Sequence, residues 1–257
     1  MPDAIQQTAD IFASLGFPPS ARVGQRIPKT AFDGALDPPA RRALAAAVES
    51  VRLAYELTPK ATGLAPAVRD GIDSSTFAAI VLGLRPSAGA AAAHMAVAAV
   101  HTAMPYPLLV LAELADGTVL LSLADKRMSA DGRQRVVLTD DPALECLPQE
   151  GPVRDAFFAA AALPAFPGNT LWLLHDFWLG LLPALAAARE TGAFRVPKDA
   201  SALRADLAEL ASLDAAIRSL RAKARTGASI AERIELNTAI KARRREREAL
   251  LAKIASA

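Results

Sequence analysis

Two apolar runs separated by an Asp-Gly pair constrain the fold of this chain more than any other feature. Residues 108–114 and 118–124 are almost entirely apolar, and Asp116-Gly117 lies between them. Because aspartate and glycine tolerate the positive φ angles of a tight turn, the pattern predicts a β-hairpin. Its second arm ends in three charged residues, Asp125, Lys126 and Arg127.

The segments around this hairpin predict an α+β fold. Residues 51–57 and 77–84 have the apolar composition of strands, and the Ala-rich stretch 87–103 favours a helix. A second Asp-Gly turn, at 131–132, precedes a further predicted strand at 134–139. We therefore expect a mostly antiparallel sheet of about five strands with helices packed on one face.

Two helices are predicted nearer the N-terminus, over residues 3–15 and 38–50. The second begins after Asp37, a good N-cap residue, with two prolines where their missing N–H groups cost nothing. Residues 22–36 between the helices show no regular pattern and are expected to be irregular.

Helical character dominates after residue 150, with helices predicted over 152–162 and 169–191. The second contains the longest apolar segment of the chain, which His175, Asp176 and Pro183 interrupt. A membrane span needs about 20 predominantly apolar residues. We therefore expect a buried helix and no membrane contact.

Residues 201–257 predict two antiparallel helices that form a coiled-coil hairpin. Leucine and isoleucine recur there at steps of three and four, and Ser229 with Glu232 makes a capping box at the second helix. The predicted organisation is a core domain at 1–191 that includes the N-terminal helix, a linker at 192–200 and this hairpin.

Positive charge is concentrated in the C-terminal hairpin. Residues 201–257 contain 12 Lys and Arg against 7 Asp and Glu, a net charge of +5, whereas the whole chain carries +2. A basic helix can neutralise phosphates, but Glu246 and Glu248 within the cluster are also typical of a solvated face with local ion pairs. Both interpretations stay open for the five clustered residues, Lys241, Arg243, Arg244, Arg245 and Arg247.

No sequence motif predicts a catalytic residue, a cofactor or a metal. The sequence lacks the glycine patterns of nucleotide-binding loops, the HExxH motif of zinc proteases and the GxSxG motif of hydrolases. A single cysteine, Cys146, excludes an intramolecular disulfide and a multi-cysteine zinc site, and fits a cytoplasmic location. His94 and His101 share a helix face but lie about 10 Å apart, too far to share one ion directly.

The charged end of the hairpin suggests one enzymatic alternative. Restriction-type nucleases hold a metal between an acidic residue and a Glu-x-Lys motif on adjacent strands. Here Glu113 ends one arm, and Lys126 and Arg127 follow the other. Because the Glu-x-Lys spacing is absent, solvated strand ends are the favoured interpretation, with a divergent nuclease as the alternative.

Four short patches in a fixed order resemble an uncharacterised bacterial family, the domain of unknown function DUF4391. The first two are an Ile-Pro-Lys element at 27–32 and a strand with a tyrosine followed by Thr-Pro at 55–59. The other two are a Pro-Tyr-Pro hairpin that ends in a lysine, at 105–126, and a helical Glu-Leu-Asn motif at 235–241. The resemblance covers about residues 22–257. The resemblance implies an association with helicases, DNA methyltransferases and mobile defence loci. It assigns no catalytic residue to this chain, because none is established in the family.

Three functional hypotheses follow. The first is an accessory interaction subunit of a DNA-directed, anti-phage defence type system, without catalysis of its own, whose C-terminal hairpin docks onto a larger helicase, nuclease or methyltransferase subunit. The second is a protein that binds DNA or RNA through the basic cluster. The third is the divergent metal-dependent nuclease.

Overall fold

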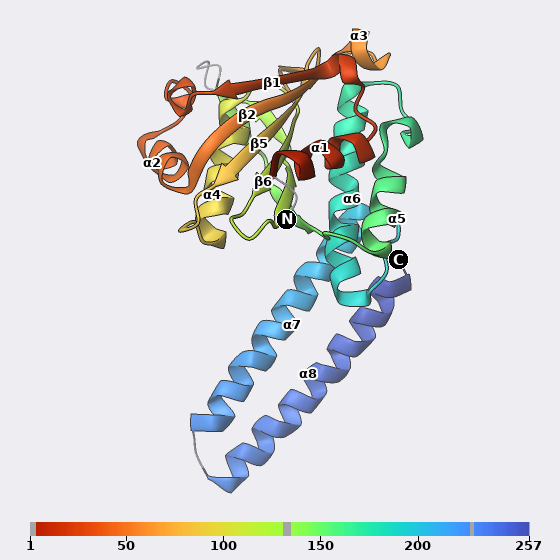
Figure 1. Ribbon diagram of the computed structural model, residues 1–257. Helices are drawn as coiled ribbons and strands as arrows, with labels where there is room; N and C mark the ends of the chain where they lie inside the picture. The colour runs from red at the N-terminus through yellow and green to blue at the C-terminus, as the bar shows by residue number, and fades with distance from the viewer. Residues whose placement is uncertain (1–3, 131–134, 227–228, 257) are drawn as a thin grey trace. The chain divides into compact units, whose positions relative to one another are not determined.

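The computed structural model describes residues 4–130, 135–226 and 229–256 and has a mixed α+β fold (Figure 1). Two compact units make up the chain, Met1–Leu182 and Pro183–Ala257. Their boundary lies within one helix, α6 (Leu171–Thr191). The predicted linker corresponds to residues 192–199, which form no helix or strand, and the predicted domain organisation stays a prediction.

A six-stranded mixed sheet forms the centre of the first unit. Neighbouring strands are antiparallel throughout, except that β5 and β6 are parallel and are joined by α4 (Ala90–Ala103). A parallel pair requires such a crossover connection. In spatial order the strands are β1 (Arg22–Ile27), β2 (Val48–Leu57), β5 (Phe77–Leu84), β6 (Leu108–Glu113), β7 (Val119–Leu123) and β10 (Ala143–Leu147).

The predicted hairpin is present as β6 and β7. Gly117 adopts a φ of 82°, and the carboxylate of Asp116 accepts a hydrogen bond of 2.9 Å from the Thr118 N–H. Gly117 has the predicted positive φ, whereas Asp116 does not and contributes to the turn through this hydrogen bond. β6 lies inside the sheet between β5 and β7.

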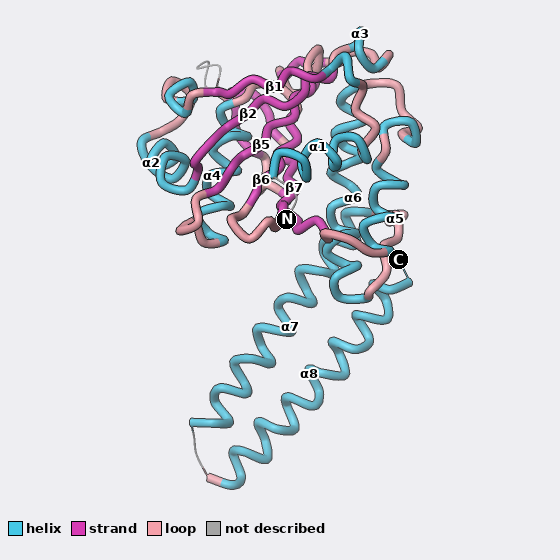
Figure 2. Tube along the Cα trace, in the orientation of Figure 1, coloured by secondary structure: helices cyan, strands magenta, loops and turns pink. Residues whose placement is uncertain are grey.

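Helices cover both faces of the sheet (Figure 2). Ala78, Ile80 and Leu82 of β5 share a buried cluster with residues of α2 (Pro38–Ala47) and α4. On the other face, Phe77 lies 5.4 Å from Trp178 of α6 between ring centroids, and Phe12 of α1 (Ala4–Ser14) lies 4.8 Å from Tyr55 of β2.

The expectation that helices cover one face was therefore wrong. The uninterrupted apolar sequences of β5 and β6 already have the composition of strands buried on both faces. All residues of β5 except Gly83 are buried, as are all residues of β6 except Glu113.

Residues 22–36 are more ordered than predicted. They contain the edge strand β1 and a short 3₁₀ helix, Lys29–Phe32. Five of the six residues of β1 are exposed, so the strand lacks the alternation of apolar and polar residues that a sequence pattern detects.

The predicted strand at 134–139 lies outside the main sheet. Its described part, β9 (Val136–Leu138), pairs with β8 (Lys126–Met128) in a separate two-stranded sheet. The predicted turn at 131–132 and Gln134 lie outside the described residues. A third small sheet pairs β3 (Val68–Arg69) with β4 (Ile72–Asp73).

The predicted helices after residue 150 are confirmed as α5 (Pro152–Ala161) and α6. By length and composition α6 could cross a membrane, but 72% of its apolar window is buried inside the fold. A short helix, α3 (Pro59–Thr62), precedes β3, and the hydroxyl of its N-cap residue Thr58 accepts a hydrogen bond from the N–H of Ala61.

The second unit contains α7 (Ala200–Thr226) and α8 (Ile230–Ser256), which run side by side in opposite directions (Figure 1). Asp214 pairs with Arg247 at 2.7 Å and Asp206 with Lys253 at 2.6 Å, which fixes the antiparallel register. Ser229 Oγ accepts a hydrogen bond of 3.4 Å from the N–H of Glu232, which is the serine half of the predicted capping box. Their buried cluster includes the end of α6 and is formed by Ala184, Ala187, Leu203, Leu210, Leu213, Leu250 and Ile254.

Candidate functional site

The structure does not bring together the two ends of the predicted nuclease constellation. Glu113 pairs with Val119 beside the hairpin turn, whereas Lys126 follows the opposite end of β7. At about 3.3 Å per residue, these positions are on the order of 20 Å apart. Arg127 lies on β8, opposite Val137, and is exposed.

Lys126 is not a solvated strand-end charge. Its side chain is buried, with a residue exposure of 2%, and its Nζ donates hydrogen bonds to the carbonyl oxygens of His101 at 3.3 Å and Met104 at 3.0 Å. These carbonyls lie at the C-terminal end of α4, where a helix has no backbone donors left to satisfy them. Burial lowers the pKa of Lys126 to about 7.

His101 is a second buried polar residue beside Lys126. Its Nε2 lies 3.1 Å from the hydroxyl of Ser122, and its Nδ1 finds no hydrogen-bond partner in the described part of the chain. Burial, and then the charge of Lys126, lower its pKa well below the usual value. Through these contacts the two residues connect α4 to Ser122 of β7 and to the start of β8 (Lys126–Met128).

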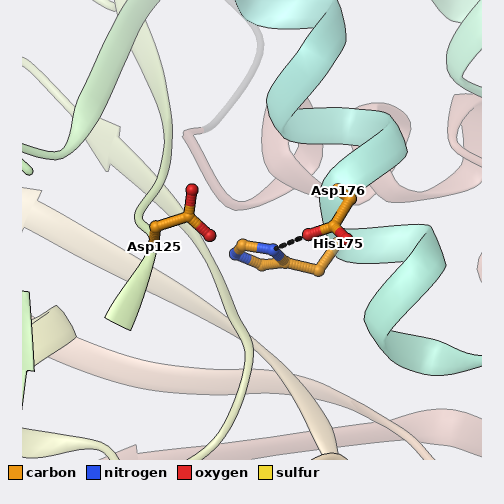
Figure 3. Close-up of side chains that lie close together, drawn as sticks. All are labelled: Asp125, His175 and Asp176. Carbon is orange, nitrogen blue, oxygen red and sulfur yellow. Dashed lines mark hydrogen bonds and ion pairs between the residues drawn. The ribbon is translucent and has the colours of Figure 1, made fainter. Parts of the chain in front are cut away.

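A cluster that the sequence did not predict lies next to Lys126. Asp125, His175 and Asp176 each offer one ligand atom, and these three atoms all lie within 4.8 Å of one another (Figure 3). Asp125 follows β7, whereas His175 and Asp176 are consecutive residues of α6. The carboxylates are half-exposed and the imidazole is fully buried.

The His175 ring has a defined orientation in this cluster. Its Nε2 lies 3.2 Å from the carbonyl oxygen of Ala124, which can only accept, so Nε2 carries a proton and donates it. Its Nδ1 lies 3.3 Å from Oδ1 of Asp176.

Arg69 of β3 neutralises part of the cluster. Its Nη1 donates to both oxygens of Asp176 at 2.7 Å, and its Nη2 donates to Asp125 at 3.1 Å. The guanidinium lies 4.0 Å from the ring centroid of Trp172. Burial alone would raise the pKa of Asp176, but the hydrogen bonds from His175 and Arg69 lower it.

One sequence signal pointed to part of this cluster. His175 and Asp176 interrupt the otherwise apolar segment of α6, and polar residues that face a core require partners. Arg69 gave no comparable signal, because it lies 107 residues from Asp176 and 56 from Asp125 along the chain.

The basic cluster of α8 contains two kinds of residue. Arg247 pairs with Asp214 at 2.7 Å and with Glu190 at 3.2 Å, and Arg243 pairs with Glu246 at 2.6 Å. The hydrogen bond to Asp214 raises the pKa of Arg247. The other three residues are exposed and make no ion pair with any residue that the structure describes; they are Lys241, Arg244 and Arg245.

Comparison with known proteins gives one match. The profile of a protein family described as a domain of unknown function, DUF4391, matches residues 15–246, which is most of the chain. No curated protein matches, and no solved structure matches.

Proposed function

The chain belongs to the DUF4391 family, and from the charges on its own helices we propose that it is an accessory subunit that binds the backbone of DNA or RNA through α8. The observation that carries the proposal is the set of Lys241, Arg244 and Arg245, three exposed cations on α8 without ion pairs in the described chain.

The helical spacing of these residues favours a single binding surface. Positions 241, 244 and 245 are separated by three and four residues, so their side chains share one face of the helix. Arg221 of α7 lines the same hollow of ≈ 390 Å³ as Arg244, which adds an arginine from the neighbouring helix, although Asp214 and Glu248 also line it. Phosphate contacts of this kind supply affinity but do not read sequence.

The proposal is tested by the salt dependence of binding. Fluorescence anisotropy with labelled duplex DNA and single-stranded RNA would be measured for the full chain at several KCl concentrations. Each phosphate neutralised on duplex DNA contributes about −0.9 to the slope of log affinity against log salt. Replacing Lys241, Arg244 and Arg245 with Gln should make the slope about 2 to 3 less negative.

A control of equal charge separates a binding surface from a general effect of net charge. Arg41, Arg42 and Arg85 are also exposed, and they lie in the first unit. Replacing these three with Gln should leave the slope unchanged. Equal weakening by both triple variants, or no binding by the unmodified chain at low salt, would contradict the proposal.

A second candidate function is docking onto a larger helicase, nuclease or methyltransferase subunit in the cytoplasm, as expected for a component of a defence system. Ile234 on α8 is 62% exposed, which is unusual for isoleucine. Leu236 and Ala239 line a hollow of ≈ 430 Å³ between α7 and α8, near the loop that joins them. We propose that the two helices wind as a coiled coil and offer these apolar residues to the partner.

The docking proposal predicts a loss of co-purifying protein. A tagged full chain purified from native cells should bring down a large ATPase or methyltransferase, and Ile234→Glu should abolish this. Met95→Glu is the matched control, because Met95 is 52% exposed on α4 of the first unit. Retention of the same partner by the Ile234 variant would exclude this surface.

A further inference from the structure

We propose that Asp125, His175 and Asp176 form a binding site for a divalent transition-metal ion, for which the Arg69 guanidinium competes. The inference concerns the first unit and is independent of the nucleic-acid surface proposed for α8. The sequence predicted no metal, because the three residues come from segments about 50 positions apart and match no ligand motif.

The first argument is the donor set. Ligand atoms bound at about 2.1 Å to one ion lie roughly 3.3 Å apart in a tetrahedral site and about 4 Å apart at most. The separation of 3.3 Å between His175 Nδ1 and Asp176 Oδ1 already matches neighbouring ligands. Because all three ligand atoms lie within 4.8 Å, the ligands need to move by about an ångström, and the Arg69 guanidinium has to leave the carboxylate oxygens.

The second argument is the orientation of His175, which is independent of the carboxylates. A metal-bound histidine usually donates its other ring N–H to a carbonyl or carboxylate, which fixes the ring and directs the free lone pair at the ion. His175 has this arrangement, since its Nε2–H donates to the carbonyl of Ala124. The residue is fully buried, and its Nδ1 faces the carboxylate of Asp176 (Figure 3).

The third argument is charge. Two ionised carboxylates carry −2, and Arg69 returns only +1 to them. A divalent ion would supply +2 to the same oxygens, so the ion and the guanidinium compete for Asp125 and Asp176. Both carboxylate side chains are 42% exposed, which leaves the ion a path from solvent.

The ligand types favour ions of the first transition row. Imidazole suits Zn²⁺ and related ions, and carboxylate oxygens suit Mn²⁺ as well as Mg²⁺ and Ca²⁺. One nitrogen and two oxygens therefore select Zn²⁺ or Mn²⁺ over the alkaline-earth ions. Three protein ligands also leave a coordination position for water or for a bound molecule.

The experiment is titration of the untagged full chain, freed of metal with a chelator, with ZnCl₂ or MnCl₂. Isothermal calorimetry gives affinity and stoichiometry, and the electron paramagnetic resonance signal of free Mn²⁺ gives an independent count of bound ions. We expect one ion per chain, with binding by MgCl₂ or CaCl₂ weaker by on the order of tenfold or more.

Variants separate the proposed site from adventitious binding. Asp125→Asn and His175→Gln should each weaken Zn²⁺ binding by about tenfold or more. Arg69→Ala should tighten it, because the competing guanidinium is removed. Asp140→Asn, which changes an exposed aspartate elsewhere, should leave it unchanged.

Three results would overturn the proposal. They are the absence of binding at 100-fold excess of both metals, equal affinity in the Asp125 and Asp140 variants, and weaker rather than tighter binding by Arg69→Ala. Circular dichroism identifies a variant that does not fold. Asp125→Asn keeps the shape of a half-exposed side chain, so the test does not depend on the buried histidine alone.

Discussion

At the scale of single residues, the most consequential side chain is Lys126, because it buries a titratable amine against two backbone carbonyls. The sequence placed it at a strand end, where charges are usually solvated. In the structure, the ammonium group of Lys126 instead donates hydrogen bonds to carbonyl oxygens at the C-terminal end of α4. The sequence does not show whether a charged residue that follows a strand is covered by a helix or exposed to solvent.

The lowered pKa of Lys126 predicts how stability changes with pH. Its pKa is about 7 in the folded chain and about 10.5 in the unfolded chain, so the unfolded state binds more protons between these values. The free energy of unfolding should therefore rise between pH 7 and pH 10, by up to about 1.4 kcal/mol per pH unit from this group.

Urea unfolding at several pH values checks this prediction. Lys126→Met should remove the rise that is due to this lysine, whereas Lys60→Met, at an exposed position, should retain it. The same pH dependence in the unmodified chain and in Lys126→Met would show that the amine does not titrate in this range.

At the scale of elements, the turn between β6 and β7 depends on one glycine. Gly117 has a φ of 82°, which L-residues with a side chain rarely adopt. Gly117→Ala should lower the free energy of unfolding by about 1 kcal/mol. Gly34→Ala is the control, since Gly34 has no positive φ and no atom within 4 Å of the added methyl group, and it should be neutral or slightly stabilising.

The arginines of α8 differ in role although they are neighbours in sequence. Arg247 links α8 to Asp214 of α7 and to Glu190, whereas Arg244 makes no ion pair with any described residue. Arg247→Ala should lower the free energy of unfolding by about 0.5–1 kcal/mol, and Arg244→Ala should leave it unchanged. Thermal unfolding of both variants at low salt measures the difference, and equal losses would contradict the assignment.

Elements with strong patterns were predicted from the sequence. The limits of β5 were predicted as observed, because its apolar run is continuous and bounded by polar residues. β1 was missed because it is exposed along almost its whole length, and the Asp125 cluster was missed because long-range contacts assemble it. Sequence periodicity reports which residues are buried, but not which distant segments meet.

At the scale of the whole molecule, charge is divided unevenly between the two units. Residues 183–257 contain 15 Lys and Arg against 9 Asp and Glu, whereas residues 1–182 contain 14 against 18. The family and the α+β class could be recognised from short motifs and apolar runs. The partner and the ligands could not, because they depend on which of the charged residues remain unpaired after folding.

The features of β1 protect one of the two edges of the main sheet from self-association. Arg22 and Arg26 are exposed on this edge strand, and Gly24, with a φ of 73°, lies where the pairing register with β2 shifts. Replacing Arg22 and Arg26 with Val and Gly24 with Thr should promote aggregation, which light scattering during mild heating would measure. Unchanged scattering would mean that other features protect this edge.

The same irregular edge limits how this protein can assemble. A straight, apolar edge strand would allow two copies to join their sheets into one continuous sheet of twelve strands, as happens in many dimers and in fibrils. Two exposed arginines and an irregular backbone in β1 disfavour the pairing of two copies through this strand. Pairing of two copies through β1 should therefore be weak, and β10 is the edge of the six-stranded sheet that lacks this protection.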